Sequence, residues 1–225
     1  MTIQERIDNY AKQFAYNGQT PLYIFNNRLY GDFIAGALYK RKNNYYGSYP
    51  HSVLERIYSL FPDCIDSVFH LFSGTIPYHF PDQLTMDIKP VVEFTDIGDR
   101  NVKHQVKPFI CDDIRNILKY KSILQKRKII IADPPYNDNH IKYKTEKVNK
   151  MQLLIDLEEC CNAGTFLCWL DSSVPIYNAK TWYGYGRITV YVGANCDIRA
   201  WTILQRTGQT LNEPIHKIEQ KVEIE

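Results

Sequence analysis

The sequence lacks the features that mark membrane-spanning, secreted and zinc-binding proteins. No run approaches the roughly 18 to 20 apolar residues of a membrane span, and Met1 is followed by a polar stretch rather than an apolar signal region. No two cysteines form a Cys-x-x-Cys pair, and most lie in apolar runs. The six are Cys64, Cys111, Cys160, Cys161, Cys168 and Cys196. We therefore expect a cytoplasmic protein without membrane association, with reduced thiols and no metal.

Net charge is also low, at +2, but it is unevenly distributed. Residues 119–150 hold nine Lys or Arg against three Asp or Glu, which is +6, so the remaining residues together carry −4. This positive charge brackets the sequence Asp133-Pro134-Pro135-Tyr136. It favours a site approached by a phosphate backbone, although a solvated helix end followed by a mobile loop explains it equally well.

The most informative stretch is KIIIADPPY, residues 128–136. Three isoleucines and an alanine predict a buried strand of a parallel sheet. Two prolines then stiffen the exit from this strand, because neither can donate to the sheet and each restricts the residue before it. Asp133 and Tyr136 should therefore lie at the carboxyl end of a strand, where open α/β sheets bind ligands.

A carboxylate, a proline-locked carbonyl and an aromatic ring suit a planar amine. The Asp133 carboxylate and the Pro134 carbonyl can each accept one N–H of an NH₂ group, while the ring of Tyr136 stacks on the heterocycle. The alternative is a tight turn at the end of the strand, with no ligand. DPPY resembles the catalytic motif of S-adenosylmethionine-dependent amino-methyltransferases, above all the DNA adenine methyltransferases. The resemblance assigns catalysis to Asp133, Pro134 and Tyr136, with Pro135 as a spacer, and implies that Tyr136 stacks on a flipped base.

Earlier strand ends are consistent with a cofactor site. Residues 65–72 have a strand pattern that breaks at Ser73-Gly74-Thr75, as a parallel sheet does where its backbone meets a cofactor. VFHLFSGT is similar to the first cofactor motif of the family, but its usual second glycine is absent. The resemblance assigns cofactor contacts to Phe72, Ser73 and Gly74. It also assigns them to Tyr46, Gly47 and Tyr49, in an upstream element that closes over the cofactor.

Acidic residues end the next two predicted strands. Asp87 follows residues 83–86 and is placed to accept hydrogen bonds from ribose hydroxyls. Asp112 and Asp113 follow residues 106–111, and one of them should cap the helix predicted over residues 114–124. The resemblance gives Asp112 to the adenine of the cofactor. With Asp133, which also lies beside the cofactor, successive strand ends predict a cofactor and then a substrate.

Residues 137–150 are polar and lysine-rich, and we expect a loop. Phosphate contacts are predicted for Lys142, Lys144 and Lys147, and contacts to the base or its neighbour for His140 and Tyr143. His140 need not be catalytic, because the amine can attack directly and lose its proton afterwards.

The remaining patterns predict helices and strands around this centre. Helices are expected over residues 2–17, 52–61 and 151–161, and strands over 165–170, 187–192 and 199–205. Residues 20–37 have a mixed pattern that predicts no element, and residues 182–186 either line a base pocket or pack under the sheet.

We therefore predict an α/β fold, a Rossmann-like seven-stranded class I methyltransferase sheet over residues 45–206. A helical or irregular extension would occupy residues 1–44 and a tail residues 207–225. The resemblance implies methyl transfer from S-adenosylmethionine to the amino group of adenine in DNA, as in small phage-type enzymes acting in a host cytoplasm.

Two kinds of alternative remain open. The same geometry serves adenine in RNA, the amine of cytosine or the amide of glutamine, although related motifs for cytosine often begin with Ser and those for glutamine with Asn. A non-catalytic nucleic-acid-binding subunit could also keep this fold. No separate recognition domain fits in the chain. Target recognition is therefore expected from the first 60 residues, from residues 137–150, or from a second chain in a homodimer or partner subunit.

Overall fold

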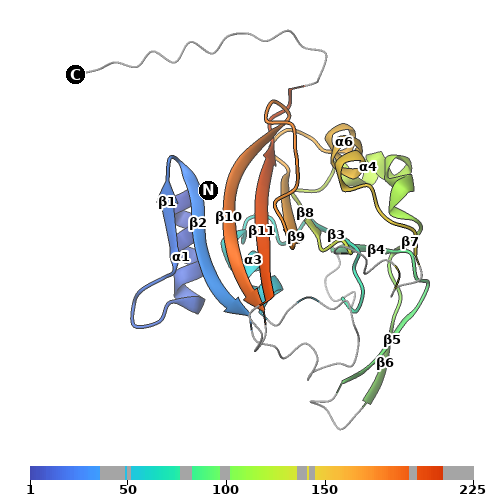
Figure 1. The fold of residues 1–225 in the computed structure, drawn as a ribbon, viewed down its shortest axis with the longest axis horizontal. Helices are drawn as coiled ribbons and strands as arrows, with labels where there is room; N and C mark the ends of the chain where they lie inside the picture. Colours follow the sequence, from blue (N-terminus) through green and yellow to red (C-terminus); the bar gives the residue numbers. More distant parts are fainter. Residues whose placement is uncertain are drawn as a thin grey trace.

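The fold is a mixed, mostly parallel sheet with helices on both faces (Figure 1). The computed structural model describes residues 1–35, 49, 52–76, 83–96, 102–135, 141, 145–192 and 197–209. Its four α-helices are α1 (Ile3–Phe14), α3 (Val53–Leu60), α4 (Lys121–Leu124) and α6 (Lys150–Cys160), and a 3₁₀ helix, η1 (Ile114–Tyr120), precedes α4. The strands are β1 (Leu22–Phe25), β2 (Arg28–Ala35), β3 (Val68–Leu71), β4 (Leu84–Asp87), β5 (Val92–Asp96), β6 (Val102–Val106), β7 (Ile110–Cys111), β8 (Ile129–Ala132), β9 (Phe166–Asp171), β10 (Trp182–Val192) and β11 (Asp197–Arg206).

Nine strands form the main sheet, in the order β1-β2-β10-β11-β9-β8-β3-β4-β7. Strands β7, β4, β3, β8 and β9 are parallel neighbours, β11 is antiparallel to both β9 and β10, and β2 is parallel to β10. The α/β class is therefore confirmed. The number of strands was underestimated by two, because β1 and β2 join the sheet beside β10.

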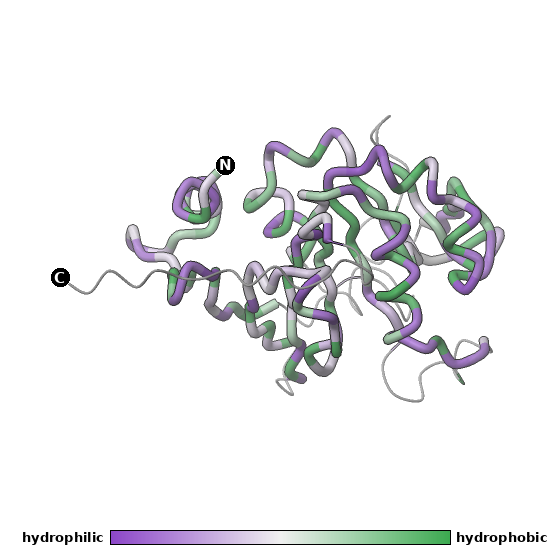
Figure 2. Tube along the Cα trace, turned by 90° about the horizontal axis from the view of Figure 1, so that it is seen from above, coloured by the Kyte–Doolittle hydropathy of each residue, from purple (hydrophilic) through white to green (hydrophobic). Residues whose placement is uncertain are grey.

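The alternation of side chains divides the core into two layers. Ile129 and Ile131 of β8 pack in a cluster with residues of α1 and α3, whereas Ile130 packs in a second cluster with residues of η1, α4 and α6. Strands β3, β8 and β9 are buried along their whole length, as expected for strands covered on both faces. Viewed from above, hydrophobic segments lie in the middle of the molecule, where these strands run (Figure 2).

The first 35 residues contain more regular structure than their pattern predicted. Helix α1 confirms the expected amphipathic helix. It begins with a capping box, in which Thr2 and Glu5 each accept a hydrogen bond from the other's backbone N–H. Strands β1 and β2 then form a hairpin closed by Asn26 and Asn27, both with positive φ. The extension predicted over residues 1–44 thus holds α1 together with two strands of the main sheet.

Three other segments differ from the sequence prediction. Strands β5 and β6 form a separate antiparallel hairpin, between β4 and β7, that the sequence pattern did not indicate. It projects away from the main sheet (Figure 1). The strand predicted over residues 106–111 divides between the end of β6 and the two-residue β7. Residues 182–186 begin β10 instead of forming a loop, and Trp182 and Tyr185 are buried, so this segment packs in the sheet.

Candidate functional site

Four aspartates and one glycine turn gather at one edge of the sheet. Because β7, β4, β3, β8 and β9 are parallel, their carboxyl ends meet along the same edge. We call this the strand-tip edge. Its residues are Gly74 after β3, Asp87 at the end of β4, Asp112 after β7, Asp133 after β8 and Asp171 at the end of β9.

The centre of the strand-tip edge is a topological switch point. From β3 the chain moves outward to β4 and β7, and it then returns to β8 on the other side of β3 and continues to β9. Leu71 of β3 is paired with Ala132 of β8, so Phe72 and Asp133 leave neighbouring strands at the same level. Open α/β sheets bind ligands at this position. The structure therefore brings the predicted glycine turn and the predicted catalytic aspartate together.

The turn after β3 has unusual backbone geometry. Phe72 has φ of 59° and Gly74 has φ of 51°, both in the left-handed region, which is uncommon for a bulky residue such as Phe72. Backbone hydrogen bonds anchor the turn to β4: the Ser73 N–H donates to the Met86 carbonyl at 3.1 Å. Strained residues held in this way are often found at ligand sites, and Phe72 was predicted to contact cofactor.

Asp87 and Gly74 are in direct contact. The Gly74 N–H donates to Oδ2 of Asp87 at 2.9 Å, and the Lys89 N–H donates to Oδ1 at 3.0 Å. An ionised carboxylate can accept about four hydrogen bonds. Asp87 therefore shapes the glycine turn and retains acceptor capacity for a ligand's hydroxyl groups.

The prolines after Asp133 are packed against the protein. Asp133 and Pro135 are half-buried and Pro134 is buried, so the backbone leaves β8 in a fixed direction. Tyr136, the last residue of the motif, lies outside the described residues, and its stacking role stays a prediction.

Tyr49 is the described member of the upstream element, because Tyr46 and Gly47 lie outside the described residues. It is buried, and its hydroxyl makes no hydrogen bond with any described residue. Burial, and secondarily the negative charge of Asp133, raise the pKa of Tyr49 well above its usual value. The structure thus places Tyr49 in the core, within reach of the charge of Asp133, in a more enclosed position than a closing loop would suggest.

His70, a buried polar residue of β3, contacts Tyr49. The ring of Tyr49 is edge-on to His70 in the middle of β3, and the Tyr58 hydroxyl is 3.1 Å from His70 Nε2. The buried Gln83 side chain also lies near the imidazole. Burial lowers the pKa of His70 to about 4 despite the opposing effect of Gln83. His70 is therefore neutral at pH 7.

Asp112 and Asp113 divide the two roles predicted for them. The Asp113 side chain accepts from the Arg115 N–H and caps η1, which confirms that one of the pair is a helix cap. Asp112 accepts from the Tyr120 hydroxyl, the Asn116 amide and the Asp113 N–H, and the first two of these bonds lower the pKa of Asp112. Its carboxylate is thus largely engaged by its own segment, and its contact with adenine stays a prediction.

The sequence reasoning missed an ion pair at the strand-tip edge. Lys150 Nζ lies 2.6 Å from Oδ2 of Asp171, which is fully buried. Asp171 also accepts from Trp169 Nε1 and from the backbone N–H of Ser172. The pair fixes the start of α6 beside β9, one strand away from Asp133. A signal was available, because the strand around Trp169 ends on an acid as its neighbours do.

The basic residues that bracket DPPY in sequence are separated in space. Lys126, Arg127 and Lys128 precede β8, so they lie at the opposite edge of the sheet, separated from Asp133 by the whole four-residue strand, which is about 13 Å long. After the motif, Lys147 is exposed, and Glu146 pairs with Arg115. The other predicted contacts, His140, Lys142, Tyr143 and Lys144, lie outside the described residues.

The described residues show no group of three metal-ligating side chains and no helix long and apolar enough to cross a membrane. Among the cysteines they include, Cys64, Cys160, Cys161 and Cys168 are buried and Cys111 is exposed.

Comparison with known proteins finds no matching family, no similar curated protein and no similar solved structure. Any function must therefore be argued from the site itself.

Proposed function

We propose that this protein transfers a methyl group from S-adenosylmethionine to the exocyclic amino group of adenine in DNA. The observation that carries the proposal is the position of Asp133 next to the Gly74 turn, at the switch point of a mostly parallel sheet. The antiparallel strand β11, inserted between β9 and β10, also supports it. A closing antiparallel hairpin is what the resemblance to class I methyltransferases implies.

The residues at the strand-tip edge fit this cofactor. Asp87 has remaining acceptor capacity at the end of β4, where a ribose is expected. Asp87, Asp112 and Asp133 together give the edge a negative character that suits a positively charged sulfonium compound. When bound, S-adenosylmethionine supplies a methyl group that is activated by the adjacent sulfonium.

The contribution of the protein to the reaction is mainly positioning. Asp133 and the Pro134 carbonyl accept the two N–H groups of the amine and direct its lone pair toward the methyl carbon. The nitrogen gains the methyl group and loses one proton to water. The Asp133 carboxylate stabilises the positive charge that develops on nitrogen. Burial of Pro134 keeps its carbonyl in place throughout.

Two features favour a second candidate, a non-catalytic nucleic-acid-binding subunit. The connection between β3 and β4 spans only residues 72–83, near the minimum of about a dozen residues for a parallel crossover. It also has a single glycine at the turn, where the family has two. Both features leave less backbone for holding a cofactor.

Two measurements test the proposal. Calorimetric titration with S-adenosylmethionine should show saturable heat, and incubation with methyl-labelled cofactor should label DNA rather than RNA or a protein acceptor. Heat on titration with S-adenosylmethionine but no labelled DNA would indicate that the methyl group is transferred to another acceptor. If the folded protein binds DNA but shows neither heat with S-adenosylmethionine nor labelling of any acceptor, the proposed activity is wrong and the chain is a non-catalytic binding subunit.

A further inference from the structure

A second surface, distant from the switch point, has an unusual composition. On β2, Leu29 and Phe33 point into the core shared with α1, so Arg28 and Tyr30 point to the opposite face. Across the strands, Tyr23 pairs with Tyr30, Phe25 with Arg28, and Arg187 of β10 with Tyr30. We call the surface made by Tyr23, Phe25, Arg28, Tyr30 and Arg187 the open face.

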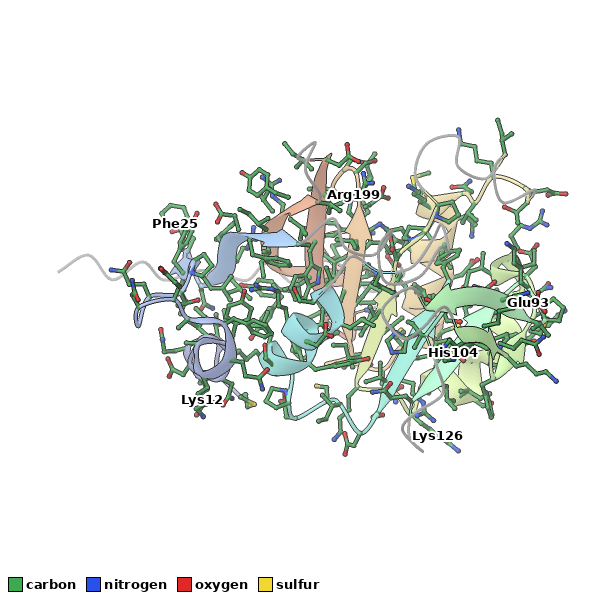
Figure 3. All side chains as sticks on the ribbon, turned by 90° about the horizontal axis from the view of Figure 1, so that it is seen from below. Lys12, Phe25, Glu93, His104, Lys126 and Arg199 are labelled. Carbon is green, nitrogen blue, oxygen red and sulfur yellow. The ribbon has the colours of Figure 1, made fainter. Side chains whose placement is uncertain are left out.

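Two of the three aromatic rings of the open face are exposed to solvent, and Tyr30 between them is half-buried. Tyr23 is 58% and Phe25 61% exposed, far above the usual exposure of large aromatic side chains. The rings of Tyr23 and Tyr30 stack with centroids 6.0 Å apart, and Phe25 meets Tyr30 edge-on at 6.4 Å. Figure 3 shows Phe25 on one side of the β1–β2 hairpin and Lys12 of α1 on the other. The rings are thus ordered by one another, and no helix of the described residues covers them.

Two guanidinium groups lie among these rings. The guanidinium of Arg28 lies 5.6 Å from the centre of the Tyr183 ring. Arg187 is exposed beside Tyr30. Within the described part of the chain, neither arginine pairs with a carboxylate within 4.0 Å. Their positive charges are therefore available to a ligand.

We propose that the open face binds single-stranded nucleic acid. Exposed aromatic rings on a flat sheet stack with unpaired bases, and nearby arginines contact the phosphates between them. A duplex hides the faces of its bases and cannot use the rings. A protein partner would need roughly 800 Å² of surface with an apolar centre, whereas the centre of this surface alternates aromatic and charged groups.

The open face also leads toward the strand-tip edge. One row further along the strands lie Asp32 and Thr189. Ile34 and Tyr191 follow at the carboxyl ends of β2 and β10, and Ile198 of β11 lies opposite Tyr191. This end of β10 faces the same edge as Asp133, because β10 and β9 run in the same direction. A single strand of nucleic acid that lies along β2 would thus reach the edge that holds the candidate site. Binding on the open face does not require methyl transfer.

The test uses fluorescence polarisation with a fluorescein-labelled single strand of about 12 mixed nucleotides, without cofactor. The single strand should bind at least tenfold more tightly than its duplex. Replacing both rings, Tyr23→Ala with Phe25→Ala, should weaken single-strand binding by about tenfold or more. The matched control is Tyr16→Ala, an exposed aromatic residue in the turn before β1, which should leave binding unchanged. Thermal unfolding followed by circular dichroism should be the same for all three proteins.

The salt dependence provides a second readout. With two arginines facing the ligand, a plot of log Kd against log salt concentration should have a slope of roughly 1.4, and R187A should lower it by about 0.7. Equal binding by the double variant and the parent would overturn the proposal, as would equal affinity for the duplex. A dimeric parent that becomes monomeric on replacing Tyr23 and Phe25 would also overturn it and assign the face to a second copy of the chain. Cofactor titration stays separate, so failure here leaves the proposed function standing.

Discussion

At the amino ends of β3 and β9 charged side chains pair with one another, whereas at the carboxyl end of β4 the carboxylate of Asp87 is held by the main chain. Arg6 is buried, donates to both oxygens of Asp63 at 2.7 and 3.0 Å, and stacks on Phe61 and Phe166. Asp87, by contrast, accepts from two backbone N–H groups and pairs with no described cation within 4.0 Å.

The difference separates charges that hold the fold from charges that can serve a ligand. Arg6 also donates to the Leu60 carbonyl and to the Tyr185 hydroxyl, so it joins α1 to the end of α3 and to β10. At the strand-tip edge, Asp87 is held by the Gly74 and Lys89 N–H groups and keeps unused acceptor capacity. Substitutions at the two edges should therefore affect different properties.

The largest expected effect is on catalysis. Asp133→Ala should lower methyl transfer by about a hundredfold to a thousandfold, because it removes both the orientation of the amine and the stabilisation of its developing charge. Asp66→Ala is the matched control, since it removes an exposed carboxylate from the opposite edge and should leave the rate unchanged. The measurement is incorporation of label into DNA under single-turnover conditions. A rate of Asp133→Ala equal to that of its parent would exclude the proposed site.

Arg6→Met should be the most destabilising change at the amino edge, costing about 3 kcal/mol in the free energy of unfolding. It leaves Asp63, the Leu60 carbonyl and the Tyr185 hydroxyl without their donor. Lys128→Met breaks the exposed pair with Asp66 at the same edge and should cost less than about 1 kcal/mol. Urea unfolding compares the two variants. If they prove equally stable, the buried pair does not organise this edge.

The loss of folding stability at low pH should come from His70, in the interior of the sheet, rather than from residues at either edge. The pKa of His70 falls from 6.5 to about 4 on folding, so between these values the unfolded chain binds a proton that the native protein does not. The free energy of unfolding should therefore decrease as pH falls, by about 2 kcal/mol between pH 7 and pH 5. His70→Gln should remove most of this decrease. Urea unfolding at the two pH values measures it, and an unchanged pH dependence in the variant would assign it to other groups.

The sequence predicted the central strands because their apolar runs stop at prolines, glycines and acids. This local signal placed Gly74, Asp87 and Asp133 at one edge. It could not show that Lys126 to Lys128 lie at the other edge, since charges close in sequence are separated by the length of β8. The depth of Tyr49 was also hidden, because a turn-rich sequence carries no information on what covers it.

Pairings between distant segments were the other part that the sequence did not reveal. Strand β2 lies beside β10, about 150 residues away, and Lys150 at the start of α6 meets Asp171 at the end of β9. The β1–β2 hairpin did leave a local signal. Asn26 and Asn27 both have positive φ, and asparagine is among the residues that favour two-residue hairpin turns.

The smallest expected effect distinguishes two acids within the strand-tip edge. Asp87→Asn should weaken binding of S-adenosylmethionine by about tenfold, because an amide cannot accept from both the Gly74 and Lys89 N–H groups and also from a ribose. Asp112→Asn should have a weaker effect, since Tyr120, Asn116 and the Asp113 N–H already occupy that carboxylate. Calorimetric titration of both variants gives the two affinities. A larger loss of affinity for Asp112→Asn would indicate that the cofactor lies nearer to β7 than to the switch point. The prediction that Asp87 binds the ribose would then be wrong.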